Sequence, residues 1–358
     1  MTDPPVAISN SGALDLAVIF GGQSSEHSIS CLSAASVLAA VDRSRYRVQA
    51  VGITRTGHWY RVSDDPADWV RNGSVLPEVT PVGEEITLAD VSADVVFPVL
   101  HGPFGEDGTI QGALELQGLP YVGSGVLASA LTMDKQATKM MLAAAGLPVG
   151  KSVAVSDADW LRHREHVLAQ LHDLNWPVFV KPARAGSSVG ITKVTSPAGL
   201  PAAIEFAREQ DRKVVVEESI ERAREIECGV LAGIGSDEPK ASLCAEIVVS
   251  GDHEFYDFQA KYLDNSATLT VPADIPDALQ KELADLAVRA FTALGADGLA
   301  RVDFFVTADS VVINEINTMP GFTEISMFPR MWQASGMTYS QIVDHLISVA
   351  VDRGVGMR

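Results

Sequence analysis

The chain has 358 residues, of which 47% are hydrophobic, and this length exceeds the size at which one core usually keeps growing, so we expect two or three globular domains. The formal net charge of −19 and the pI near 4.7 argue against a broad surface for nucleic acid or anionic membranes, because such surfaces are built from clustered Lys and Arg. No apolar run is long enough to span a membrane and residues 1–15 lack the pattern of a signal peptide, so we expect a soluble, cytosolic protein.

The first part of the chain predicts two buried strands, each followed by a glycine-rich turn and a helix. Leu16–Phe20 leads into Gly21-Gly22, after which apolar residues recur at helical spacing. Val95–Leu100 leads into residues 101–108, HGPFGEDG, before a helix from about Thr109. Ligands of open α/β sheets bind beyond the carboxyl ends of the strands, so both turns are candidate binding sites.

Two polar residues in these turns each have an ordinary structural explanation as well. Glu26 stands at the entrance of the first helix, where an acid interacts favourably with the helix dipole without any further role. His101 could equally be a turn residue. Cys31, Cys228 and Cys244 show neither CxxC spacing nor a secretory context, so we expect reduced, buried thiols.

A central segment is predicted to begin with the helix that Met133-Asp134-Lys135 opens and that Gly146-Leu147-Pro148 ends at about Ala145. A strand over Val178–Lys181 and another over Lys213–Glu218 follow. We expect strands and helices again from about residue 226.

The loop Lys181–Gly190, KPARAGSSVG, joins a lysine to small and hydroxyl-bearing residues. Its N–H and O–H groups could surround phosphate oxygens while Lys181 offsets their charge. It is not a Walker A loop, and taken alone a Gly/Ser loop is more often a simple hairpin turn.

Two further segments have features that are found in functional sites. Gly123–Ala128 fits the dinucleotide pattern GxGxxA, but no βαβ unit with a ribose-binding acid follows, so a nicotinamide site is disfavoured. The polar stretch Gly251–Pro272, which contains Lys261-Tyr262, lacks the apolar pattern of a core element and would suit a lid or an ordinary exposed loop.

A hairpin near the C-terminus carries polar side chains where core strands would be apolar. If Ala308–Ser310 form a short loop, Asp303 lies opposite Glu315 and Arg301 lies opposite Asn317. A connection one residue longer would break this pairing. Two carboxylates and an amide oxygen on one face suit Mg²⁺ that shares ligands with phosphates, although each acid alone would fit a solvated surface hairpin.

These motifs in this order resemble the D-alanine:D-alanine ligases of the ATP-grasp superfamily. The resemblance is carried by GGQSSE at 21–26, HG at 101–102, GEDG at 105–108, MDK at 133–135, the loop 181–190, KY at 261–262, RVD at 301–303 and NEINTMPG at 314–321.

The resemblance implies an α/β, three-domain ATP-grasp fold. Its N-terminal domain would cover residues 1–133 with a flexible leader at 1–15, the central domain 134–224, and the C-terminal domain 225–358 with a lid loop at 251–272.

The resemblance also implies an ATP site between the central and C-terminal domains. Its residues would be Lys135, Lys181 and Ser188 at the phosphates, Glu217, Glu218 and Ile220 at the adenine, and Glu225 at the ribose. Mg²⁺ or Mn²⁺ would be held by Asp303, Glu315 and Asn317.

The family's substrate residues map onto both ends of the chain. Glu26 would bind the amine of the first D-alanine and connect through Ser187 to Tyr262. The other residues would be His101 near the first substrate, Lys261 in the lid, and Arg301, Gly321 and Ser326 at the second substrate and the developing oxyanion.

The implied reaction joins two D-alanines through a D-alanyl phosphate for peptidoglycan precursor synthesis, in a homodimer by family analogy. The alternatives are a ligase that uses D-lactate or another acceptor, an NAD-dependent dehydrogenase, and a nucleotide-binding regulator without turnover. Tyr262 favours the dipeptide-forming type.

Overall fold

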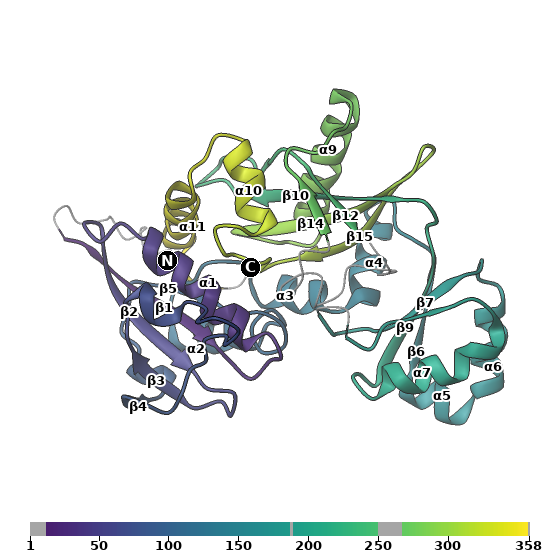
Figure 1. The fold of residues 1–358 in the computed structure, drawn as a ribbon, viewed down its shortest axis with the longest axis horizontal. Helices are drawn as coiled ribbons and strands as arrows, with labels where there is room; N and C mark the ends of the chain where they lie inside the picture. Colours follow the sequence, from purple (N-terminus) through teal and green to yellow (C-terminus); the bar gives the residue numbers. More distant parts are fainter. Residues whose placement is uncertain (1–11, 187–188, 250–266, 357–358) are drawn as a thin grey trace, which may run out of the picture.

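The structure, a computed structural model, describes residues 12–186, 189–249 and 267–356. It contains three sheets, and Figure 1 shows them side by side, with the third sheet between the first and the second. Their strands come from residues 14–99, 152–218 and 224–317 respectively. The domain limits expected from the sequence stay a prediction.

The first sheet has the strand order β4-β3-β2-β1-β5, in which β1 pairs in parallel with both β2 and β5. Alternate residues of β1 enter two different cores, Leu16, Val18 and Phe20 on one face and Ala17 and Ile19 on the other. This two-sided burial explains the unbroken apolar sequence that predicted the strand. The strands are β1 Leu14–Gly21, β2 Tyr46–Ile53, β3 Trp59–Val62, β4 Glu84–Ile86 and β5 Val95–Val99.

Helices from both ends of the chain cover this first sheet. On one face α1, the predicted helix, packs together with α10 and α11 from the C-terminal end, and α2 covers the other face. The helices are α1 His27–Ala40, α2 Thr109–Gln117, α10 Met327–Ala334 and α11 Tyr339–Arg353, with short 3-10 turns η1 Pro66–Trp69 and η2 Leu88–Asp90.

The second sheet is antiparallel, in the order β6-β9-β7-β8. Val178, Val180, Val214 and Val216 face a core closed by α5, α6 and α7. The alternate positions, including Lys181, therefore face away from that core. The elements are β6 Ser152–Ser156, β7 Val178–Pro182, β8 Thr192–Val194, β9 Lys213–Glu218, α5 Asp157–Arg162, α6 Arg164–His172, α7 Leu200–Arg208 and the turn η3 Pro197–Gly199.

The third sheet has the order β13-β12-β10-β14-β15, with β11 paired to β10. Ile226, Cys228, Val302 and Ile316 belong to a core that α9 and part of α4 close. The elements are β10 Arg224–Leu231, β11 Lys240–Ala241, β12 Ala245–Val249, β13 Ala267–Thr270, β14 Leu299–Val306, β15 Val311–Asn317, α3 Val126–Met133, α4 Lys135–Ala144 and α9 Asp277–Ala293.

The predicted pairing of the C-terminal hairpin is present, but its loop is longer than expected. Val306 pairs with Val311, so four residues connect the strands instead of Ala308–Ser310 alone. The register then shifts by one residue between Asp303 and Phe304, which leaves Asn314 as the extra residue of a β-bulge. The bulge cancels the added loop residue and restores the predicted pairs.

Two other expectations can be checked against this fold. The interpretation of 251–272 as one irregular loop is wrong at its end, because Ala267–Thr270 form β13 and complete a ladder with β12, while residues 250–266 lie outside the description. All three cysteines are free and buried, as expected. Within the described residues, no helix is long and apolar enough to cross a membrane.

Candidate active site

A cavity of about 1310 Å³ lies where the three sheets meet. Every predicted site residue that the structure describes lines it: Glu26, His101, Lys135, Lys181, Glu217, Glu218, Ile220, Glu225, Arg301, Asp303, Glu315, Asn317, Gly321 and Ser326. The remaining predicted residues, Ser187, Ser188, Lys261 and Tyr262, lie outside the described part of the chain. No residue of Gly123–Ala128 lines the cavity, so the position of this segment does not support a dinucleotide site.

On the second sheet a buried carboxylate lies between two lysines. Lys181 Nζ is 2.8 Å from Glu217 Oε2 and Lys139 Nζ is 3.5 Å from Glu217 Oε1. Burial alone would raise the pKa of Glu217, but the charges of Lys181 and Lys139 lower it to about 2. Glu217 therefore stays ionised between the two lysines, although burial lowers the pKa of Lys139.

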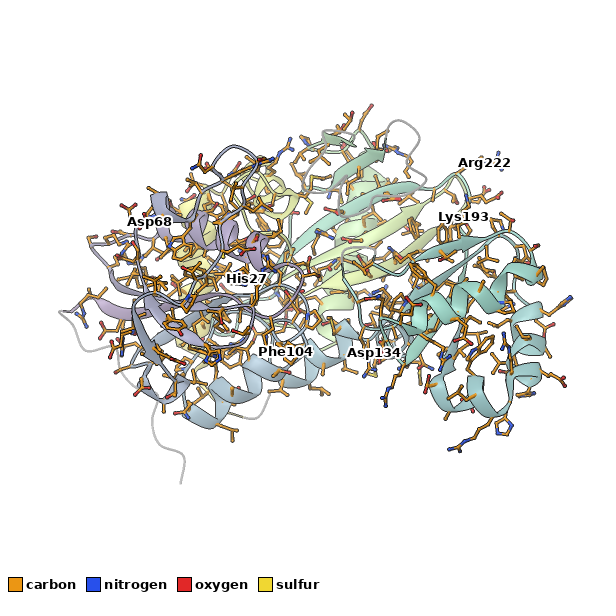
Figure 2. The ribbon with its side chains drawn as sticks, turned by 60° about the horizontal axis from the view of Figure 1, so that its bottom comes forward. His27, Asp68, Phe104, Asp134, Lys193 and Arg222 are labelled. Carbon is orange, nitrogen blue, oxygen red and sulfur yellow. The ribbon has the colours of Figure 1, made fainter. Side chains whose placement is uncertain are left out.

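The start of α4 is anchored to the second sheet. Asp134, labelled in Figure 2, caps α4 through the N–H groups of Gln136 and Ala137 and accepts hydrogen bonds from Lys213 Nζ at 2.7 and 2.8 Å. Lys135 Nζ donates to the carbonyl of Ala185 at 2.8 Å. This fixes the described start of the loop Lys181–Gly190 beside α4.

The acids on the facing hairpin surround Arg301. The guanidinium donates two hydrogen bonds of 2.7 Å to the carboxylate of Asp303 and lies 3.2 Å from Glu227 Oε1. Asn317 Nδ2 donates to Asp303 Oδ2 at 3.2 Å. The structure thus brings together the residues that strand pairing predicted, and it adds Glu227 from β10, which pairs with Asp303 across the ladder.

The donor set on this hairpin fits a hard divalent cation. Asp303, Glu315 and Asn317 present carboxylate and amide oxygens from one face of adjacent strands, and all three line the cavity. Two carboxylates, with Glu227 beside them, also supply more negative charge than Arg301 alone offsets. The residues present are therefore suited to Mg²⁺ or Mn²⁺.

Glu26 lies at the opposite wall of the cavity. It is the N-cap residue of α1 and is 8% exposed, yet its carboxylate makes no capping hydrogen bond. A Cβ added to Gly102 would lie 2.7 Å from Glu26 Oε2, and one added to Gly186 would lie 3.2 Å away. The carboxylate therefore packs against both glycine-rich loops, and the helix dipole by itself does not account for this arrangement.

The loop after β5 contacts the turn that follows β15. His101 Nδ1 lies 3.0 Å from the carbonyl oxygen of Met319, and its Nε2 lies 3.0 Å from Ser33 Oγ. Glu106 accepts hydrogen bonds from the N–H of Gly102 at 2.6 Å and from the N–H of Met319 at 3.2 Å. Both ring nitrogens of His101 are thus engaged by protein groups.

The other predicted residues occupy the rim of the cavity. Glu218 accepts hydrogen bonds from Asn175 and lies 3.3 Å from Lys151 Nζ, so its carboxylate is turned toward the exposed edge of the second sheet. Ser326 Oγ accepts a hydrogen bond from the N–H of Thr323 at 3.1 Å, just before α10. The roles of these residues stay predictions.

Three residues near the site were given no role from the sequence. Glu106 belongs to the recognised GEDG motif. Lys139 follows Lys135 by four residues and therefore shares its helix face, and Glu227 alternates with Glu225 on β10. The helical and strand periods contained these signals, but the partner of each residue comes from a distant segment.

Glu106 predicts a measurable pH dependence of stability. Burial, together with the charge of Glu26, raises the pKa of Glu106 from 4.5 to about 8, although the two N–H donors oppose the shift. Because the folded protein holds this proton more tightly, the contribution to stability is complete below pH 4.5 and is lost as the pH rises toward 8. The free energy of unfolding of the wild type should therefore fall relative to that of Glu106→Gln over this interval. Urea denaturation at several pH values measures it, and a constant difference would contradict the assignment.

The second and third sheets are both antiparallel and face each other across the cavity, with Lys181 on one and the acids of the C-terminal hairpin on the other. This arrangement is typical of the ATP-grasp class of fold. Residues 15–124 match the family model described as D-ala D-ala ligase N-terminus, and residues 141–348 match D-ala D-ala ligase C-terminus. The chain belongs to the D-alanine–D-alanine ligase family, whose members are ATP-dependent ligases.

Individual relatives agree with this assignment over nearly the whole chain. D-alanine–D-alanine ligases of Arthrobacter sp. (strain FB24) and Nocardia farcinica are each 52% identical, over 96% of this chain and 95% and 98% of their own lengths. Among solved structures, the VanG D-Ala:D-Ser ligase from Enterococcus faecalis superimposes with a TM-score of 0.81 at 37% identity, covering 95% of this chain and all of its own. The D-alanine–D-alanine ligase from Coxiella burnetii gives 0.79 at 38%, over 96% and 95%.

Proposed function

We propose that this protein joins two molecules of D-alanine to D-alanyl-D-alanine at the cost of one ATP, releasing ADP and phosphate for peptidoglycan precursor synthesis. The observation that carries the proposal is the single cavity that all predicted and described site residues line. This reaction needs three things in one place: lysines that bind the nucleotide, a hairpin that binds the metal, and a carboxylate that binds the amine of the substrate.

In the proposed nucleotide site, Lys135 and Lys181 neutralise the phosphates, and Glu217, Glu218 and Ile220 flank the adenine. The ion pair with Glu217 holds the ammonium group of Lys181 at the cavity wall, which supports its assignment to a phosphate. Phosphoryl transfer depends mainly on positioning and charge neutralisation, which these groups supply. Glu225, whose strand β10 borders the cavity, is assigned to the ribose.

Asp303, Glu315 and Asn317 would hold Mg²⁺ or Mn²⁺, which supplies charge neutralisation of the transferring phosphoryl group when bound. The bidentate contact of Arg301 with Asp303 holds that carboxylate in place and keeps the guanidinium at the cavity wall. Arg301 and the N–H of Gly321 are the groups assigned to the developing oxyanion.

The proposed first substrate binds with its ammonium group at Glu26 and near His101. Its carboxylate attacks the γ-phosphorus of ATP, and the bond to ADP breaks, giving D-alanyl phosphate. The amine of the second D-alanine loses a proton and attacks the acyl carbon, and phosphate leaves as the peptide bond forms. Ser326 is assigned to the binding of this second substrate. Water must be excluded, because an acyl phosphate hydrolyses. Ser187 and Tyr262, which the family resemblance assigns to closure, lie outside the described residues, as do Ser188, assigned to the phosphates, and Lys261, assigned to substrate binding.

The fold alone does not set the acceptor, because a solved relative with the same fold is a D-Ala:D-Ser ligase. We assign D-alanine because Tyr262 resembles the lid residue of dipeptide-forming members. A homodimer, expected from the family, and a cytoplasmic location, expected from the sequence pattern, are likewise predictions.

Purified protein with ATP, Mg²⁺ and D-alanine is expected to release phosphate and form D-alanyl-D-alanine in equal amounts. L-alanine, and D-lactate or D-serine supplied as acceptor beside D-alanine, are the comparison substrates, and D-alanine should be preferred strongly near neutral pH. Absence of D-alanine-dependent phosphate release across a broad range of pH and metals would reject the proposed function. Formation of the ester or of the serine dipeptide as readily as D-alanyl-D-alanine would reject only the acceptor.

A further inference from the structure

The turn Met319-Pro320-Gly321 is held by side chains of the loop that follows β5. The N–H of Met319 donates to Glu106 Oε1 at 3.2 Å, and its carbonyl oxygen faces His101 Nδ1 at 3.0 Å. Both polar backbone atoms of this one residue are therefore held by the loop after β5. The side chain of Met319 is 7% exposed and packs in the core of the first sheet, so the residue is fixed on three sides.

The same carboxylate reaches the other wall of the site. Glu106 Oε2 accepts the N–H of Gly102 at 2.6 Å, and Gly102 packs directly against the carboxylate of Glu26. Through two hydrogen bonds Glu106 thus connects Gly102, which packs against the residue assigned to the first substrate, with the turn that carries the oxyanion donor.

The protonation of His101 is set by its neighbours. Because Nδ1 faces a carbonyl oxygen, it must carry the proton, and Nε2 then accepts from Ser33 Oγ. Burial lowers the pKa of His101, which keeps the ring in this neutral form. The ring of His101, held by Ser33 of α1, therefore supports the carbonyl group of Met319, while Glu106 of the same loop supports its N–H.

We infer that Glu106, together with His101, is a positioning clamp that sets the N–H of Gly321 for the ligation step. The inference rests on the proposed function for the reaction that it serves. Proline at 320 has a fixed φ, which removes one of the backbone rotations that could absorb a displacement of Met319 before it reaches Gly321. Loss of the clamp should therefore impair attack by the amine more than binding of ATP or formation of D-alanyl phosphate.

The alternative is that Glu106 merely ties two parts of the fold together. The two readings differ in the fate of the acyl phosphate. If only ligation is slowed, D-alanyl phosphate waits longer and is hydrolysed, so more phosphate is released per dipeptide formed. If the fold alone is weakened, phosphate and dipeptide fall together.

The variants Glu106→Ala and Glu106→Gln test this, with Asp107→Asn as the matched control. Asp107 belongs to the same loop and accepts the N–H groups of Phe104 and Thr109, but the contacts of Met319 do not involve it. We expect dipeptide formation by Glu106→Ala to fall about 10- to 100-fold, with the KM for ATP nearly unchanged and the ratio of phosphate to dipeptide raised above one. Glu106→Gln, which keeps one acceptor oxygen, should lie between it and the wild type. An unchanged ratio in Glu106→Ala, or the same increase in Asp107→Asn, would overturn the clamp.

Hydrogen exchange separates this inference from the proposed function. The amide of Met319 should exchange faster in Glu106→Ala than in the wild type or in Asp107→Asn, whatever reaction the protein catalyses. If the wild type releases no phosphate with D-alanine, the proposed function fails while exchange still measures the contact. If exchange at Met319 is unchanged, the clamp is wrong even when the wild type is an active ligase.

Discussion

Replacing Glu315 by glutamine is expected to reduce dipeptide formation roughly 100- to 10,000-fold, and Asp303→Asn should be at least as severe. A lost metal ligand removes several kcal/mol of charge stabilisation from the transition state. Asp303→Asn also removes one of the two acceptor oxygens that Arg301 contacts, so Glu315→Gln is the cleaner variant. Steady-state phosphate release at saturating Mg²⁺ measures the loss.

Asp309→Asn is the matched control, because Asp309 lies on the exposed tip of the same hairpin and not among the residues that line the cavity. Binding of Mn²⁺ with a non-hydrolysable ATP analogue, followed by electron paramagnetic resonance, gives a readout that does not depend on turnover. Near-normal activity and Mn²⁺ binding in both cavity variants would contradict the metal site and favour the interpretation as a solvated surface hairpin.

Glu217→Gln is expected to destabilise the protein more than Lys181→Met does, although Lys181 is the residue assigned to the phosphates. In the wild type one buried carboxylate serves two lysines. Lys181→Met leaves Glu217 paired with Lys139, whereas Glu217→Gln leaves both lysines without the carboxylate between them. Removing one partner from a buried ion pair costs about 3–5 kcal/mol, so we expect a loss of this size for Glu217→Gln and a smaller one for Lys181→Met.

Turnover should show the reverse contrast, because Lys181→Met removes a charge from the ATP phosphates and should raise the KM for ATP and lower kcat. The double variant should be more stable than Glu217→Gln alone. Glu218→Gln is the control for stability, since Glu218 pairs with Lys151, whose side chain is 56% exposed, and such pairs contribute about 0–1 kcal/mol. Equal unfolding free energies for Glu217→Gln and the wild type, measured in urea, would show that the cluster contributes no net stability.

Local sequence pattern was enough to predict the main elements and the faces of their side chains. The apolar run of β1, the cap at Asp134 and the alternation of Arg301 and Asp303 each follow from short-range sterics and periodicity, which a single segment contains. The same periodicity predicted that Asp303 and Glu315 would be neighbours. Their pairing holds only because a bulge at Asn314 compensates for a longer turn, and no periodic pattern contains that bulge.

Which distant segments come into contact could be seen only in the folded chain. Glu106 and Met319 are separated by 213 residues, and the return of α10 and α11 to the first sheet brings them together. Likewise β13 lies in a polar stretch and becomes a strand because β12 offers it an open edge. The physical reason is that local pattern fixes the face on which a side chain lies, whereas its partner depends on how separate hydrophobic faces are buried against one another.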